Sequence, residues 1–197
     1  SRKRIAEAKH LVDNPPKTGG GYPRILTARR YIHYFIIFLA ASGVRPGEAN
    51  RILHMNVKKV KHKDDKKCYL SVWIKGKKGD RKVLVKYGGY FAYLGLCEKV
   101  CPDYKPEDLV FPRIPRGGLR DLIIDADLRY TQNGDKRDSK SLRHFYIMQG
   151  LANKTPPKAM CIQCDVSPTI MKNHYERHAT VDLFKDDLLK VGDFQSP

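Results

Sequence analysis

The sequence has no apolar segment long enough to cross a membrane. Its longest apolar run, from Tyr31 to Ala41, is interrupted by His33, whereas a spanning helix needs about 20 apolar residues. We therefore expect this run to form a buried core helix, and we expect no membrane partner. The sequence also lacks a signal peptide and begins with Ser1 rather than Met, so we expect a fragment of a longer protein.

The cysteines do not suggest a disulfide framework. There are five of them, an odd number, in a lysine-rich chain that has no secretory signal. This content is typical of reduced thiols in a cytoplasmic protein.

Acidic residues are scarce. The 197 residues include 21 Asp and Glu against 38 Lys and Arg, so the formal net charge is +17. A hydrophobic content of 41% is enough to build a core and excludes wholesale disorder. The positive excess favours a polyanionic partner, and nucleic acid fits best because each neutralised phosphate releases a counterion. A ribosome-associated protein and a surface that binds anionic lipid remain alternatives.

The pattern of apolar residues and turn formers predicts several short elements. Residues 58–67 are densely basic, and we expect a solvated loop there. Two strands, 68–74 and 82–87, flank a basic tip and predict a hairpin. The helices that we expect are 27–42 with Thr27 as its cap, one beginning at Pro46, and then 89–100, 119–130, 139–152, 159–164 and 168–178.

Three segments carry residue types suited to one chemistry. Transfer of a DNA phosphodiester needs a nucleophile, cations on the non-bridging oxygens and an acid for the leaving oxygen. Arginine binds phosphate through two parallel hydrogen bonds, tyrosine can act as a covalent nucleophile, and lysine or histidine can donate a proton. The segments are Ala41–Glu48 (ASGVRPGE), Lys140–Phe145 (KSLRHF) and Ser167–His178 (SPTIMKNHYERH).

In this order the segments resemble the tyrosine recombinases of the phage-integrase type. The first segment is similar to the family's first arginine box, the second to its His/Lys-x-x-Arg-His box, and the third to the stretch that holds the nucleophilic tyrosine. Arg45 and Arg143 are 143 − 45 = 98 residues apart, and Tyr175 follows Arg143 by 175 − 143 = 32. The resemblance covers about residues 25–178. Each box alone is a weak signal, and their joint order is a strong one.

The resemblance implies a site-specific recombinase that cuts and rejoins duplex DNA. Tyr175 would attack the scissile phosphorus and become linked to the DNA 3′-phosphate. Arg45 and Arg143 would hold the non-bridging oxygens, and Glu48 would orient these cations. No metal and no cofactor are implied, because arginines and lysines supply the positive charge.

Lysines complete the site that the resemblance implies. Lys140 takes a position that histidine often holds, close to the phosphate and the attacking oxygen. A lysine of the basic hairpin would protonate the departing 5′-oxygen. Lys75 follows a strand as the family lysine does, whereas Lys77 fits better when counted back from Val83, so both remain candidates. Contacts to DNA are expected from Lys78, Arg81 and His144.

The resemblance also implies the fold, the partners and the setting. We expect a mainly α-helical α+β fold with a small antiparallel β-sheet, and a homo-oligomer, a tetramer, assembled on duplex DNA. The protein would belong to a phage or mobile element and act in the cytoplasm on nucleoid or host-cell DNA. Residues 1–24 are expected to be a basic linker after a missing N-terminal DNA-binding domain, residues 25–178 the catalytic domain, and residues 179–197 a tail exchanged between protomers.

One position departs from the family pattern. The family usually places His or Trp nine residues before the tyrosine, after a glycine, and here Asp165 and Val166 occupy these places. Either the hydrogen bond from this position is lost, or His174, His178 or a water molecule supplies it.

A competing motif lies in the same stretch. Cys161 and Cys164 with His174 and His178 resemble a zinc ligand set. The nine residues between the pairs are fewer than the twelve that are usual in a DNA-binding finger. A DNA-binding module without catalysis, either zinc-containing or a degenerate recombinase relative, is therefore the alternative function.

Overall fold

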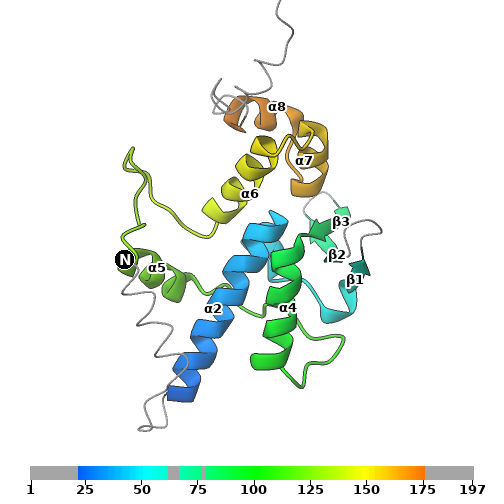
Figure 1. Ribbon diagram of the computed structural model, residues 1–197, viewed down its shortest axis with the longest axis vertical. Helices are drawn as coiled ribbons and strands as arrows, with labels where there is room; N and C mark the ends of the chain where they lie inside the picture. The colour runs from blue at the N-terminus through cyan, green and yellow to red at the C-terminus, as the bar shows by residue number, and fades with distance from the viewer. Residues whose placement is uncertain (1–21, 62–66, 77–78, 176–197) are drawn as a thin grey trace, which may run out of the picture.

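The computed structural model describes residues 22–61, 67–76 and 79–175. The chain has a mixed α+β fold in which a small antiparallel sheet lies at one side of the helices (Figure 1), so the expected fold class is confirmed. In chain order the elements are α2 (Tyr22–Ser42), α3 (Pro46–Ala49), the 3₁₀ turn η1 (His54–Asn56), β1 (Val57–Lys61), β2 (Cys68–Gly76), β3 (Gly79–Val85), α4 (Tyr87–Lys99), α5 (Arg116–Asp125), α6 (Ser141–Ala152), α7 (Pro157–Cys164), α8 (Pro168–Ile170) and the π-helical turn η2 (Met171–Tyr175).

Helix α2 is the central element and lies beside α4 (Figure 1). Its aromatic residues Tyr31, Phe35 and Phe38 recur at helical spacing, and all three are buried. The helix begins at Tyr22, so the expected cap at Thr27 is wrong: Thr27 lies within the helix. The earlier start is compatible with Pro23, because proline is tolerated in the first turn of a helix.

The sheet has the order β1-β2-β3, and both pairs are antiparallel. Leu70, Val72 and Ile74 of β2 alternate along one face and are buried. Val72 pairs with Val57 of β1 on one side and with Val83 of β3 on the other. The expected hairpin of two strands is confirmed, with longer strands than the sequence indicated.

Strand β1 corrects an expectation. The lysine-rich segment 58–67 was expected to be a loop, yet Val57–Lys61 is a strand whose last four side chains are exposed. Backbone pairing with β2 holds this segment in the sheet. Because its side chains are mostly exposed, the sequence shows no alternation of apolar and polar residues that would predict a strand. Exposed lysines suit an edge strand because their charge opposes pairing with another chain.

Two separate clusters of buried apolar side chains form the interior. The first lies between α2, the sheet and α4, with Phe111 packed edge-on against Phe35 and Phe38. The second lies among α6, α7 and η2, and includes Ile147, Met160 and Met171. These two clusters define what we call the first region (residues 22–114) and the second region (residues 141–175).

The last described helix differs from the expectation for residues 168–178. It is α-helical only over Pro168–Ile170 and continues as the π-helical turn η2 to Tyr175. Ser167 caps it by accepting a hydrogen bond from the Ile170 backbone N–H. The expected linker up to residue 21 and the expected exchanged tail 179–197 lie outside the described residues. Among the helices that the structure describes, none is long and apolar enough to cross a membrane.

Candidate active site

The first arginine box forms a turn between α2 and α3. Gly43 ends α2 in a left-handed conformation with φ +68°, and Arg45 then precedes Pro46 at the first position of α3. This start confirms the expected helix at Pro46, because proline needs no hydrogen-bonded N–H there. The Glu48 carboxylate accepts from the Arg45 backbone N–H at 3.0 Å and from Arg45 Nη1 at 2.8 Å.

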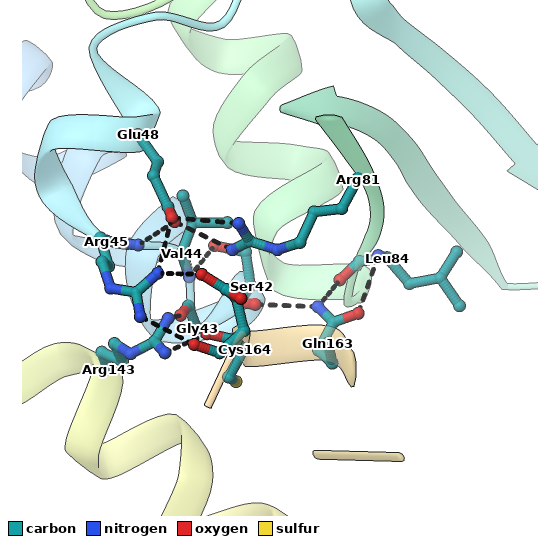
Figure 2. A network of polar contacts seen from close by, with 11 residues as sticks. Ser42, Gly43, Val44, Arg45, Glu48, Arg81, Leu84, Arg143, Gln163 and Cys164 are labelled. Carbon is teal, nitrogen blue, oxygen red and sulfur yellow. Dashed lines mark hydrogen bonds and ion pairs between the residues drawn. The ribbon is translucent and has the colours of Figure 1, made fainter. Parts of the chain in front are cut away.

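Glu48 also binds a second arginine. Arg81 of β3 donates from Nη1 and Nη2 to the two carboxylate oxygens of Glu48 at 3.0 and 2.9 Å (Figure 2). Burial alone would raise the pKa of Glu48, but hydrogen bonds from Arg81 and Arg45 outweigh it and lower the pKa to about 2. Arg81 was expected to contact DNA. Here both of its terminal nitrogens bind Glu48, and its side chain is only 15% exposed.

Arg143 of the second box points from α6 toward the ends of two other helices. Its residue is only 7% exposed. Nη1 donates to the carbonyl of Gly43 at 2.8 Å, and Nη2 donates to the carbonyl of Cys164 (Figure 2). Carbonyls at the C-terminal ends of helices lack partners within the helix and attract cations. The helix ends of α2 and α7 therefore hold this guanidinium between the two regions.

Asp165 is a site residue that the sequence did not single out for a role. Its Oδ2 accepts from Arg45 Nη1 at 2.8 Å, and its backbone carbonyl accepts from Arg45 Nη2 at 2.7 Å. It has a left-handed backbone with φ +49° directly after α7. Asp and Asn adopt this conformation more readily than other non-glycine residues. An aspartate directly after a predicted helix was therefore the one sequence signal for a left-handed turn at this position.

Gln163 attaches α7 to the first region. Its side-chain amide accepts from the Leu84 backbone N–H at 3.1 Å and donates to the Leu84 carbonyl at 2.7 Å (Figure 2). It also donates to the carbonyl of Ser42 at 2.9 Å. The amide thus bonds the edge of β3 as a neighbouring strand would.

One open cavity of about 850 Å³ brings the boxes together. It lies between the first region, α5 and the start of α6. The expected site residues that line it are Arg45, Glu48, Lys75, Lys140, Arg143, His144 and Tyr175. Of the remaining expected residues, Arg81 lies behind Glu48, and Lys77 and Lys78 lie outside the described residues. The structure therefore gives Lys75 a place at the cavity but no basis for comparing it with Lys77.

Further basic residues line the cavity that the sequence did not single out. Arg51 follows α3, whereas Arg116 and Arg120 belong to α5 and Arg129 to the following loop. Nothing in their spacing marks them, because the chain brings them to the cavity from separate segments. With Lys75 and Lys140 they make a concave surface of strong positive charge, which suits a polyanion.

Tyr175 ends the described chain at the floor of this cavity. The residue is only 6% exposed, and its ring centroid lies 5.4 Å from that of His144. Burial raises the pKa of Tyr175, and the nearby charges of Arg143 and Arg45 oppose this rise. Burial and the charge of Arg143 lower the pKa of His144, which favours its neutral form.

The structure places the departure at Val166 and part of the zinc motif. Val166 packs against the apolar cluster of the second region, His174 is exposed, and neither is among the residues that line the cavity. Within residues 22–61, 67–76 and 79–175, no group of three or more His, Cys, Asp or Glu side chains could hold a metal ion. His178, the fourth residue of the zinc motif, lies outside these ranges.

Comparisons with known proteins bear on the fold. The sequence matches no family model and no curated protein. Among solved structures, the XerH site-specific recombinase bound to its palindromic difH substrate, in a post-cleavage complex, is similar with a TM-score of 0.59 and 15% identity, over 95% of this chain and 51% of that chain. XerA recombinase matches with a TM-score of 0.57 and 16% identity, over 89% of this chain and 64% of that one. The Tn1549 transposon integrase in complex with transposon right end DNA matches with a TM-score of 0.52 and 16% identity, over 90% of this chain and 66% of that one.

These similarities establish that the chain has the catalytic-domain fold of tyrosine recombinases. The chain spans about half the length of the XerH recombinase and about two thirds of the other two.

Proposed function

We propose that this chain is the catalytic domain of a site-specific tyrosine recombinase, an integrase of a phage or mobile element. The observation that carries the proposal is the cavity. It gathers a tyrosine, two arginines and two lysines from segments up to 175 − 45 = 130 residues apart. A tyrosine surrounded by cations is the combination that covalent phosphoryl transfer requires.

The proposed reaction has one bond formed and one broken. The phenolic oxygen of Tyr175 attacks the scissile phosphorus, the phosphorus–5′-oxygen bond breaks, and a 3′-phosphotyrosyl bond remains. The phenolic proton passes to water, and the 5′-oxygen gains a proton from the ammonium group of Lys75 or Lys77, which recovers one from water. Arg45 and Arg143 stabilise the charge on the non-bridging oxygens. Attack of a second 5′-hydroxyl on the phosphotyrosine reverses these steps and rejoins the strands.

Three further residues act around this reaction. Lys140 borders the cavity at the start of α6, where its ammonium group faces the phosphate. His144, whose ring centroid lies 5.4 Å from that of Tyr175, would contact the DNA backbone next to the attacked phosphate. Glu48 holds Arg45 in place through its carboxylate.

The partner in this proposal is duplex DNA, and cleavage needs no metal. The XerH and Tn1549 proteins are seen in complexes with DNA, and the basic cavity fits a DNA backbone. We propose that protomers assemble on DNA as a tetramer, that residues 25–178 form the catalytic domain after a linker (residues 1–24), and that residues 179–197 are exchanged between protomers. Cleavage is expected to persist in excess EDTA, and its loss on chelation would favour a zinc protein instead.

The test is a covalent adduct. The chain is incubated with a library of random-sequence duplexes that carry a nick, which traps the cleaved strand, and the products are run on a denaturing gel. Wild type should form a DNA-linked species, and Tyr175→Phe should form none while binding DNA normally. Tyr130→Phe, at an exposed tyrosine, is the matched control and should retain the adduct.

Sequencing the trapped DNA would give the target site. An adduct that persists in Tyr175→Phe would contradict the nucleophile. DNA binding by wild type without any adduct would favour the alternative, a DNA-binding module without strand transfer.

A further inference from the structure

Three consecutive residues at the end of α7 bond either the first region or one of two cavity arginines, Arg45 and Arg143. Gln163 bonds Leu84 and Ser42, the Cys164 carbonyl accepts from Arg143, and Asp165 accepts twice from Arg45. Asp165 differs from its two neighbours because it contributes a charge. It joins Arg45 across 120 positions of sequence.

The backbone of Asp165 explains how it binds twice. With φ +49° and ψ +55°, the chain turns left-handed immediately after α7. In a continuing right-handed helix the carbonyl would point along the helix axis. Here the carbonyl and the carboxylate of one residue both face the same guanidinium. A left-handed backbone is unfavourable for a non-glycine residue, so these two bonds offset a conformational cost.

Counting the N–H groups of Arg45 shows what remains for a ligand. A guanidinium has five N–H donors. Nη1 donates to Glu48 Oε1 and to Asp165 Oδ2, and Nη2 donates once to the Asp165 carbonyl. One N–H on Nη2 and the N–H on Nε have no partner in the described part of the chain. These two form a fork on adjacent nitrogens, the arrangement that binds two phosphate oxygens.

The position of the side chain matches this count. The Arg45 side chain is 43% exposed and lines the cavity. Without the Asp165 carboxylate, Nη1 would keep only Glu48 and Nη2 only the backbone carbonyl of residue 165, and these two bonds hold the guanidinium less firmly than three.

We infer that Asp165 is a positioning residue, which orients Arg45 so that its remaining fork faces the scissile phosphate. This inference rests on the proposed function, because it assigns Asp165 to the same reaction. The fork is set by two acceptors from the second region and one from the first, so the arginine is in place only when the two regions are joined.

If only the charge of Asp165 mattered, its removal would speed cleavage, whereas a positioning role predicts slower cleavage. Asp165 places a negative charge beside a site for a polyanion, so its removal should strengthen DNA binding. If the carboxylate only competed with phosphate, its removal would also speed cleavage. A positioning role requires slower cleavage in spite of equal or tighter binding.

The experiment compares Asp165→Gly and Asp165→Asn with wild type. Glycine keeps the left-handed backbone and the carbonyl acceptor, and asparagine also keeps a side-chain oxygen without the charge. Single-turnover cleavage at saturating DNA should fall by about ten-fold or more in Asp165→Gly and by less in Asp165→Asn, while the Kd for DNA does not rise. Asp127→Asn is the matched control, because Asp127 has φ +56° in the loop after α5 and does not line the cavity; it should cleave like wild type.

A second measurement does not depend on catalysis. In ¹⁵N NMR of the free protein, a guanidinium held by three acceptors rotates slowly and gives separate Nη signals. Wild type should show such signals for Arg45, and Asp165→Gly should lose them while its melting temperature stays close to that of wild type.

The outcomes separate the two proposals. Unchanged or faster cleavage in Asp165→Gly, or Arg45 signals that do not change, would overturn the positioning role and leave the recombinase proposal intact. A wild type that forms no adduct would overturn the recombinase proposal, and the NMR comparison would still decide whether Asp165 fixes Arg45.

Discussion

The two regions of this molecule differ in how they are built. The first region, residues 22–114, has sixteen buried apolar residues between α2, the sheet and α4, whereas the second, residues 141–175, has seven. The smaller cluster offers less apolar burial to hold its helices, so the second region depends more on its contacts with the first. Hydrogen bonds from Arg143 to Gly43 and from Gln163 to Ser42 and Leu84 are among these contacts (Figure 2).

The residues to which we assign the proposed reaction are divided between these regions. Arg45 and Lys75 belong to the first, whereas Arg143 and Tyr175 belong to the second. The bonds that join the regions are therefore also the bonds that assemble the site. Removal of Arg143, which joins the regions and lines the cavity, should therefore lower stability and cleavage together, whereas removal of Arg45 should lower mainly cleavage.

The largest effect on cleavage is expected from Arg143→Ala. Cleavage should slow by about 10²-fold or more, the scale of losing a transition-state donor. The protein should also lose about 2 kcal/mol of stability, because two buried carbonyls, one from each region, lose their partner. Arg45→Ala should slow cleavage similarly with a smaller loss of stability, since that side chain is 43% exposed.

Single-turnover cleavage and urea unfolding of both variants would measure this contrast. Equal stability losses would remove the difference between the regions. Losses of DNA binding as large as those of cleavage would make both arginines ordinary DNA contacts.

Gly43→Ala should break the joint itself. Gly43 has φ +68°, and an added Cβ would clash with Tyr146 and Cys164 of the second region. The left-handed backbone and the overpacking should together cost about 3–4 kcal/mol. Thermal unfolding measures the loss, with Gly47→Ala as the control, because a Cβ at Gly47 meets nothing within 4 Å. A melting temperature equal to that of the control would show that the regions adjust to each other freely.

Glu48→Gln tests the charge inside the first region through pH. Because Arg81 and Arg45 lower the pKa of Glu48 to about 2 in the folded protein, its ionised form stabilises the fold above the unfolded pKa of about 4.3. That contribution, about 2–3 kcal/mol, is lost as the pH falls through the folded pKa. Wild type should therefore be more stable than Glu48→Gln at pH 6, and the difference should shrink toward pH 2. A difference that stays constant from pH 6 to pH 2.5 would contradict the role given to the carboxylate.

The smallest effect is expected from Gln163→Ala. The amide makes three hydrogen bonds to the first region, and losing them should cost about 1–2 kcal/mol. The second region should then open before the first, so amide hydrogen exchange should quicken in α7 and leave α4 unchanged. Gln149→Ala, at an exposed side chain of α6, is the control. Equal exchange in α7 of the two variants would show that the joint does not need this amide.

Much of the fold could be predicted from local sequence patterns. Where the predicted elements were wrong, the reason is physical. The spacing of Tyr31, Phe35 and Phe38 indicated α2, and Pro46 marked the start of α3. Strand β1 was missed because an edge strand covered with lysines is held by backbone pairing, which leaves no apolar pattern. Residues 168–178 were expected to form a helix because they include good helix formers. In the structure the stretch Met171–Tyr175 is a π-helical turn, and Met171 and Tyr175 pack into the second cluster.

By itself the sequence determined which reactive groups are present and their order along the chain, because the arginine, lysine and tyrosine boxes can be recognised in one dimension. It also determined the excess of positive charge, which depends only on composition. Only the tertiary structure decided which acceptors each guanidinium has: Arg81 turns inward to Glu48, and Asp165 reaches Arg45 from 120 residues away. Hydrogen bonds act over about 3 Å, so partners that meet only when two regions pack leave no trace in the spacing of residues.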